Sequence, residues 1–299
     1  MPSLLACGDT AEARLREDGG MAAHRIGIVG IENTHVDGIV RALNVDGVED
    51  ARITALVAGV ADRTERLAEL GGIERIVTAS TDLIGEVDAL IVATRDGSTH
   101  RSLAVPFLEA GVPVWIDKPL ALSVADADAI LAAAGSTPVT SSSTLRWLPD
   151  TDAVAAALPS IGEVQSLTIT GPADPDGPYG GLFFYGIHLA DLAQRLVPGA
   201  PEEVEVEHSP GRVRARYAVG GVGVTLDFVR PEGEVSVPFR VTAVGSGGTE
   251  SREIVVGSDY VRPGVEAFVR MLDTGELPVP PEQMTATVAV LAAVVAERS

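Results

Sequence analysis

The chain has 299 residues, of which 46% are hydrophobic, and this is ample for packed cores and excludes a disordered protein. Its 42 acidic residues outnumber its 22 basic ones, so the formal net charge of −20 excludes nucleic acid and anionic membranes as favourable partners. The length predicts two domains, at about 150 residues per domain.

The single cysteine, Cys7, excludes an intramolecular disulfide and a thiolate metal cluster, and it fits a reducing, cytoplasmic location. The longest apolar run, residues 286–296, is too short to span a bilayer and predicts a buried C-terminal helix. Residues 1–22 lack the basic and apolar segments of a signal peptide. We expect them to form a disordered extension, with Met21 as an alternative start.

From Arg25 onward, strand and helix patterns alternate. Apolar runs predict strands at 25–30, 52–57, 76–77, 87–94 and 112–116, with helices between and after them at 34–44, 61–70, 102–110 and 123–134. Ser123 is placed as the cap of the last of these helices. The alternation predicts a doubly wound parallel sheet, a Rossmann-like domain over residues 23–148. Ligands bind such sheets beyond the carboxyl ends of the strands, and the first turn, Thr94 and Lys118 all fall at that edge.

After Pro149 the pattern changes. Helices are predicted at 151–158, 186–196, 265–272 and 286–298, and strands at 164–170, 204–207, 213–218, 222–229, 237–244 and 251–256. A run of strands after a βα half predicts a second, α+β domain over residues 149–299, with a largely antiparallel open sheet. We expect its last helix to pack back on the first domain.

Lys118 is the only lysine in the chain, and every other basic residue counted above is arginine. It follows the apolar run Val114-Trp-Ile-Asp and precedes a proline. Arginine cannot replace lysine where a compact ammonium must donate and take back a proton, because a guanidinium stays protonated. We therefore interpret Lys118 as functional; a stray surface lysine is the alternative.

Two segments, Asp117-Lys118-Pro119 and Gly186-Ile-His-Leu-Ala-Asp191, follow Thr94 and His100 in a fixed order. In this they resemble the glucose–fructose oxidoreductase/inositol dehydrogenase/rhizopine-catabolism (Gfo/Idh/MocA) family, from Arg25 to the C-terminus. The family signature Glu-Lys-Pro is matched with a conservative change, and Gly-x-His-x-x-Asp is matched fully. The resemblance implies an N-terminal domain that binds NAD or NADP, a second domain that binds substrate, and a homodimer or homotetramer assembled through the open sheet.

The dinucleotide fingerprint Gly-x-Gly-x-x-Gly is altered here, because residues 30–35 read Gly-Ile-Glu-Asn-Thr-His. Glu32 places a carboxylate near the site where a helix N-terminus attracts phosphate, and it repels a pyrophosphate unless it points away. Asn33 or Thr34 can still cap the helix, and His35 can donate to a phosphate. The expected cofactor contacts are Gly30, Asn33, Thr34, His35, Thr94, His100 and Lys118.

No acid ends the second strand, which runs into Val57-Ala-Gly59. Arg63 can meet the 2′-phosphate of NADP, or it is an ordinary exposed helix arginine. The choice between NAD and NADP therefore stays open.

A second departure from the family pattern lies just before the expected active-site histidine. Family members commonly carry an aspartate four residues before the active-site histidine, and this position is Phe184. The neighbouring Tyr185 is either a hydrogen-bonding substitute or a packed aromatic. A poorly characterised branch of the family is similar at both departures, with an Asp/Glu-x-(Ser/Thr)-His turn and a Tyr-Gly-Ile-His segment.

The resemblance and the residue chemistry together imply the catalytic pair Lys118 and His188. His188 is the natural general base for a substrate hydroxyl, and Lys118 holds the same oxygen and stabilises alkoxide charge. Asp191, one helical turn beyond, binds a substrate hydroxyl, orients the imidazole, or is a solvated helix acid. Arg146 grips a substrate oxygen or forms a surface ion pair, and Tyr185 is the remaining candidate substrate contact.

Two functions follow. The first is an NAD(P)-dependent oxidoreductase that transfers a hydride between nicotinamide and a hydroxyl or carbonyl of a sugar, inositol or related small polar substrate. The alternative, motivated by Glu32, His35 and Phe184, is a degenerate, non-catalytic member that acts as a ligand-binding or regulatory protein. The histidines are too far apart in sequence to show local zinc-ligand spacing, so no metal site is predicted.

Overall fold

The computed structural model describes residues 23–48, 50–233 and 236–297. The predicted extension over residues 1–22, with Cys7 and Met21, lies outside the described residues. Within the described ranges no helix is both long and apolar enough to cross a bilayer.

The first half of the chain forms a six-stranded sheet in the order β3-β2-β1-β4-β5-β6, and each neighbouring pair is parallel. Its strands are β1 (His24–Val29), β2 (Ala51–Val57), β3 (Arg75–Val77), β4 (Ala89–Val92), β5 (Val114–Ile116) and β6 (Val139–Thr140). The predicted Rossmann-like sheet is confirmed. The strand order reverses between β1 and β4, and this reversal opens the ligand-binding crevice at the carboxyl edge.

The helices of this half are α1 (His35–Val40), α2 (Ala61–Gly71), α3 (His100–Glu109) and α4 (Val124–Ala134). The helix predicted over 34–44 is confirmed, and its second half is a π-helical turn at Arg41–Val45. Ser123 caps α4 as predicted, because its Oγ accepts from the backbone N–H of Asp126 at 3.1 Å. The sequence did not reveal β6, since two residues carry no periodicity.

The second half forms a six-stranded mixed sheet in the order β12-β11-β7-β10-β9-β8. Only β7 and β10 pair in parallel, so the prediction of a largely antiparallel sheet is confirmed. Its strands are β7 (Val164–Pro172), β8 (Glu202–Ser209), β9 (Arg212–Val219), β10 (Val222–Val229), β11 (Phe239–Gly245) and β12 (Gly248–Ile254). The remaining helices are α5 (Pro149–Ala157), α6 (Leu182–Tyr185), α7 (Ile187–Leu196), α8 (Arg262–Thr274) and α9 (Pro281–Ala296).

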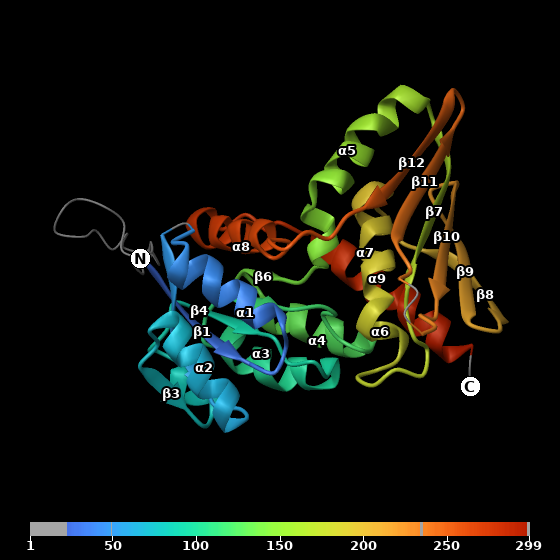
Figure 1. Cartoon of the computed structure of the whole chain (residues 1–299). Coiled ribbons are helices and arrows are strands. Elements are labelled where there is room, and N and C mark those ends of the chain that lie inside the picture. The colour runs from blue at the N-terminus through green and yellow to red at the C-terminus, as the bar shows by residue number, and fades with distance from the viewer. Residues whose placement is uncertain (1–22, 49, 234–235, 298–299) are drawn as a thin grey trace, which may run out of the picture.

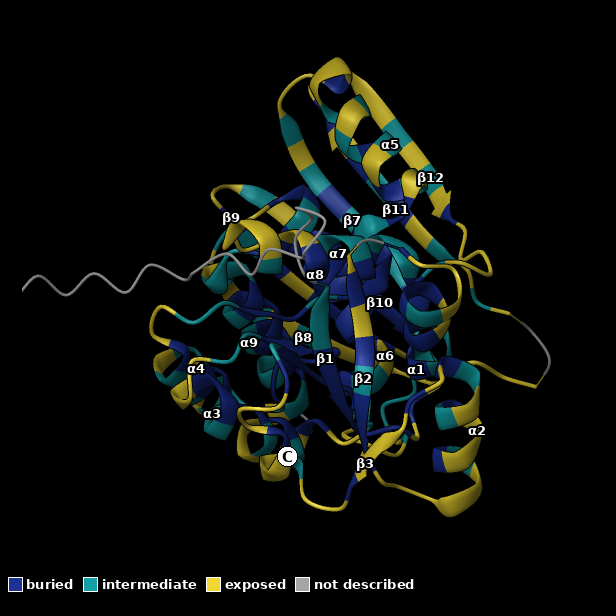
Figure 2. Ribbon diagram, turned by 90° about the vertical axis from the view of Figure 1, so that its left-hand side faces the viewer, coloured by how far each residue is buried: buried dark blue, intermediate teal, exposed yellow. Residues whose placement is uncertain are grey.

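Helices α7 and α9 lie between the two sheets (Figure 1). Every residue of α7 except Arg195 is buried, so this helix is held rigidly at the centre of the molecule. Helix α8 returns to the first domain, where Val265 and Phe268 join the cluster that contains Trp115. Figure 2 shows that the strands of the first sheet are mostly buried and that α2 carries exposed residues. The last two helices therefore tie both domains into one body around the carboxyl edge of the first sheet.

The face of the second sheet turned away from α7 is polar. Strand register aligns one polar residue from each strand in a row across it: Ser251, Thr242, Thr168, Thr225, Arg216 and Glu205. This face needs no apolar cover, so exposed apolar surface is no reason to expect an oligomer through it.

Candidate active site

The first turn leaves β1 at Gly30, and glycine is required there. Its φ is +88°, and a Cβ on it would lie 2.2 Å from the backbone nitrogen of Thr94. This close approach joins the ends of β1 and β4. Within the described ranges the backbone N–H groups of Glu32, Asn33 and Thr34 donate to no acceptor. A surviving glycine and open N–H groups beside a helix start fit the phosphates of a dinucleotide.

Arg63 braces this turn from α2. Its Nε donates to the carbonyl of Ile31 at 2.7 Å, its Nη2 donates to the carbonyl of Asn33 at 2.9 Å, and its guanidinium pairs with Asp37. Reading Arg63 as an exposed helix arginine is therefore wrong. The side chain of Glu32 turns toward the end of β2, where its Oε1 accepts from the N–H of Val60 at 3.1 Å.

Asp117, at the end of β5, is a buried hub for the same turn. It accepts from Asn33 Nδ2 at 2.8 Å, and His35 Nδ1 lies 3.0 Å from its Oδ2. Burial raises the pKa of Asp117, but the charge and hydrogen bond of His35, with the charge of Lys118, outweigh it and leave the pKa below its usual value. The expected His35 donor is thus engaged with Asp117. Asn33 caps the first turn through its Oδ1, and Thr34 makes no side-chain cap.

The expected cofactor residues Thr94 and His100 belong to the frame of the crevice. His100 is fully buried, and its two ring nitrogens lie 2.8 Å from the carbonyl of Pro119 and 3.0 Å from that of Thr94. The hydroxyl of Thr94 pairs with that of Thr99 at 2.7 Å. His100 therefore links the segments that follow β4 and β5.

Lys118 is buried at the carboxyl end of β5, so the interpretation as a stray surface residue is wrong. Its Nζ donates to the carbonyl of Phe184 at 3.1 Å and lies 4.5 Å from the centre of that ring. Burial lowers the pKa of Lys118; Asp117 opposes this effect and Arg95 adds to it. The ammonium therefore releases its proton more readily than that of an exposed lysine.

His188, the second catalytic candidate, is a buried residue of α7. Its Nδ1 lies 2.6 Å from Ser143 Oγ, which leaves Nε2 without a partner among the described residues. Burial, followed by the charges of Lys118 and His35, lowers the pKa of His188 well below its usual 6.5. The imidazole is therefore neutral at pH 7.

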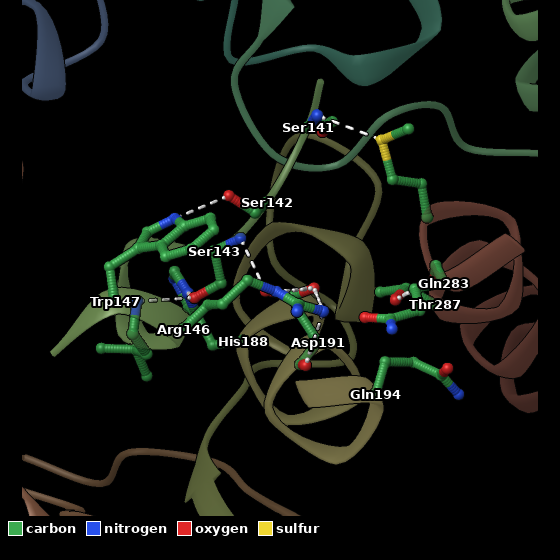
Figure 3. A network of polar contacts seen from close by, with 12 residues as sticks. Ser141, Ser142, Ser143, Arg146, Trp147, His188, Asp191, Gln194, Gln283 and Thr287 are labelled. Carbon is green, nitrogen blue, oxygen red and sulfur yellow. Dashed lines mark hydrogen bonds and ion pairs between the residues drawn. The ribbon is translucent and has the colours of Figure 1, made fainter. Parts of the chain in front are cut away.

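Arg146 and Asp191 bind each other in the interior (Figure 3). The guanidinium approaches the carboxylate through Nε and Nη2 at 3.0–3.2 Å, and each side chain is only 3% exposed. Asp191 also accepts from the N–H of Ser143 at 3.0 Å. The alternatives of a solvated acid and a surface ion pair are both wrong.

An aromatic wall surrounds the two catalytic candidates. Its rings stand 5.3–5.4 Å apart along Tyr179, Phe184 and Tyr185, and His188 lies between Tyr185 and Phe239 at 5.8 and 5.6 Å. Tyr185 is 47% exposed, so the wall is open to solvent. Lys118 Nζ lies 5.9 Å from the same Tyr185 ring, and residues from the two domains thus converge on one surface.

Sequence reasoning missed Ser143, Tyr179 and Phe239. Ser143 closely follows β6, so recognising that strand would have placed it at the carboxyl edge beside Lys118. A cavity of about 10 Å³, room for about one water, is lined by Lys118, residues 141–143 and Asp191, among others. Among the described residues, no group of three or more His, Cys, Asp or Glu side chains is placed to hold a metal ion.

Comparison with known proteins agrees with this geometry. Residues 24–144 match the model of an oxidoreductase family with an NAD-binding Rossmann fold. The chain is 40% identical over 111 residues to inositol 2-dehydrogenase 1 of Saccharopolyspora erythraea, covering 36% of this chain and 32% of the relative. It is 29% identical over 212 residues to myo-inositol 2-dehydrogenase of Thermotoga maritima, covering 67% and 61%. The chain thus spans less than two thirds of either relative.

Among solved structures, GenD2 from gentamicin A biosynthesis, in complex with NAD, superposes with a TM-score of 0.77 at 17% identity, covering 99% of this chain and 98% of that one. This likeness extends the shared fold over both domains. The family match itself lies in the first domain, where residues 24–144 match the Gfo/Idh/MocA family of oxidoreductases.

Proposed function

We propose that this protein is an NAD(P)-dependent oxidoreductase acting on a hydroxyl or carbonyl group of a sugar, an inositol or a related small polar ring. The observation that carries the proposal is the convergence of Lys118 and His188, from separate domains, on the aromatic wall at the carboxyl edge of the first sheet. The two relatives described above are named as inositol dehydrogenases, which supports this substrate class.

The residues at the turn would hold the dinucleotide. Gly30 allows close approach of the backbone, and the N–H groups of Glu32, Asn33 and Thr34 are available for phosphate oxygens. The nicotinamide would supply the hydride chemistry, and the protein orients the substrate and moves one proton.

The proton transfer falls to His188 and Lys118. Neutral His188 offers Nε2 to the substrate hydroxyl, with Ser143 holding Nδ1. Lys118 donates to the same oxygen and stabilises the negative charge that develops on it. Because the pKa of His188 is lowered well below its usual value, the imidazole passes the proton on. Lys118, whose pKa is also lowered, releases one of its own protons to solvent and takes up this one, so that the ammonium is restored and one proton leaves the site in each oxidation. Tyr185 packs against a ring face of the substrate.

The proposal includes a homodimer or homotetramer in the cytoplasm. Arg216 and Glu205, adjacent in the polar row of the second sheet, suit a self-complementary contact between two copies. Light scattering of the purified protein measures the assembly.

The test is turnover with NAD and NADP against a panel of inositols, pentoses and hexoses, for the wild type, Lys118→Met and Lys118→Arg. Methionine removes the charge, and arginine keeps the charge but cannot release a proton. We expect both variants to bind nucleotide and to lose about 10²- to 10⁴-fold in kcat, the usual size of a general acid–base contribution. Wild-type turnover by Lys118→Met overturns the assignment. Nucleotide binding without turnover on any substrate favours the non-catalytic alternative.

A further inference from the structure

The end of β2 lacks a residue that Rossmann domains use. Such domains place an acid there, about 20 residues after the fingerprint, to bind the ribose hydroxyls of NAD. Here β2 ends at Val57 and runs through Ala58 and Gly59 to Val60. None of these side chains can accept a hydrogen bond from a ribose.

Glu32 brings a carboxylate to this position from the neighbouring turn. Its Oε1 accepts from the N–H of Val60 at 3.1 Å, and its Oε2 has no partner among the described residues. A Cβ on Gly59 would lie 1.9 Å from Oε1, so a side chain at 59 would displace the carboxylate from this position. The sequence departs from the usual pattern twice, with an acid in the turn and none at the end of the strand. In the structure the acid of the turn lies at the end of that strand.

The arginines that could instead favour a 2′-phosphate are engaged elsewhere. Helix α2 contains Arg63 and Arg66, and both pair with Asp37. Arg63 also donates to two carbonyls of the turn. At this edge a 2′-phosphate would therefore meet the negative charge of Glu32 with no free guanidinium from α2 to offset it.

We infer that Glu32 supplies the carboxylate that binds the adenosine ribose hydroxyls, and that this protein therefore selects NAD over NADP. The inference rests on the proposed function, because it requires a dinucleotide in the crevice. The carboxylate of Glu32 then lies beside the ribose and away from the pyrophosphate, which the N–H groups of the turn bind.

The experiment is calorimetric titration of the full chain with NADH and with NADPH, for the wild type, Glu32→Gln and Asp62→Asn. Glutamine keeps an oxygen for the Val60 N–H and removes the charge, and Asp62 is an exposed acid two residues beyond Val60. We expect the wild type to bind NADH at least about tenfold more tightly than NADPH. In Glu32→Gln the ratio of the NADPH to the NADH dissociation constant should fall by about ten- to a hundredfold, which is the size of a charged hydrogen bond. In Asp62→Asn this ratio should stay as in the wild type.

If both variants lose the preference for NADH equally, the selectivity comes from the overall negative charge and the inference is overturned. Tighter binding of NADPH than of NADH by the wild type would also overturn it. Binding of neither nucleotide overturns the proposed function itself, and the inference with it. Competition against NADH on the wild type needs no variant: 5′-AMP should displace NADH and 2′-AMP should not. Displacement by both overturns the role of Glu32 even if Glu32→Gln fails to fold.

Discussion

Each catalytic candidate stands beside a buried acid, and the two acids are held in different ways. Asp117 precedes Lys118 and is bound by an amide and an imidazole, those of Asn33 and His35. Asp191 lies one turn beyond His188 and is bound by the guanidinium of Arg146. A guanidinium keeps its charge at every working pH, whereas an imidazole can lose it. The second domain thus anchors its catalytic residue through a guanidinium, and the first domain anchors its own through an amide and an imidazole.

Breaking the fixed pair should have the largest effect. Arg146→Met leaves Asp191 charged and unpaired in the interior, which costs about 3–5 kcal/mol of unfolding free energy. Urea denaturation at pH 7 measures it. The control is Arg75→Met, which breaks a pair whose side chains are 51% and 45% exposed and should leave the free energy of unfolding nearly unchanged. Equal losses in the two variants would contradict the structural role of the buried pair.

Removing the Asp117 carboxylate should lower the free energy of unfolding by less, and this loss should depend on pH. Asp117→Asn removes the negative charge that faces His35 and Lys118, and a neutral amide oxygen accepts from Asn33 and His35 less strongly, so we expect a loss of about 1.5–3 kcal/mol of unfolding free energy at pH 7. Because folding lowers the pKa of Asp117, its contribution is present above its unfolded value near 3.8 and is lost as pH falls through the lower folded value. Chemical denaturation from pH 7 to 3 should show a constant difference between the two proteins above pH 3.8 and the beginning of its decrease below that value.

The smallest effect concerns His188, whose folded pKa is lowered. The unfolded chain takes up a proton near pH 6.5 that the folded chain does not, so stability falls as pH drops below 6.5. This residue should contribute a slope of up to about 1.4 kcal/mol per pH unit, which His188→Gln removes. His208→Gln, at an exposed site on β8, is the matched control. An unchanged slope between pH 6.5 and 5 in His188→Gln would show that this imidazole is not buried in its neutral form.

Much of the fold could be predicted because its signals are local. Apolar runs and helical periodicity placed the parallel sheet, the mixed sheet and the carboxyl edge on which Lys118 lies. The features that the sequence did not show have local causes too. Strand β6 is too short for a pattern, and the π-helical turn after α1 keeps an ordinary helical sequence. The loss of β6 also hid Ser143, the residue that holds His188.

The sequence by itself determined the order of the two domains, the edge where ligands bind, and the one lysine placed there. Only the tertiary structure decided which side chains pair with which. Arg146 and Asp191 are 45 residues apart, His35 and Asp117 are 82 apart, and Glu32 and Val60 are 28 apart. Periodicity repeats over two to four residues and says nothing about such separations, because partners this distant meet only when whole elements pack.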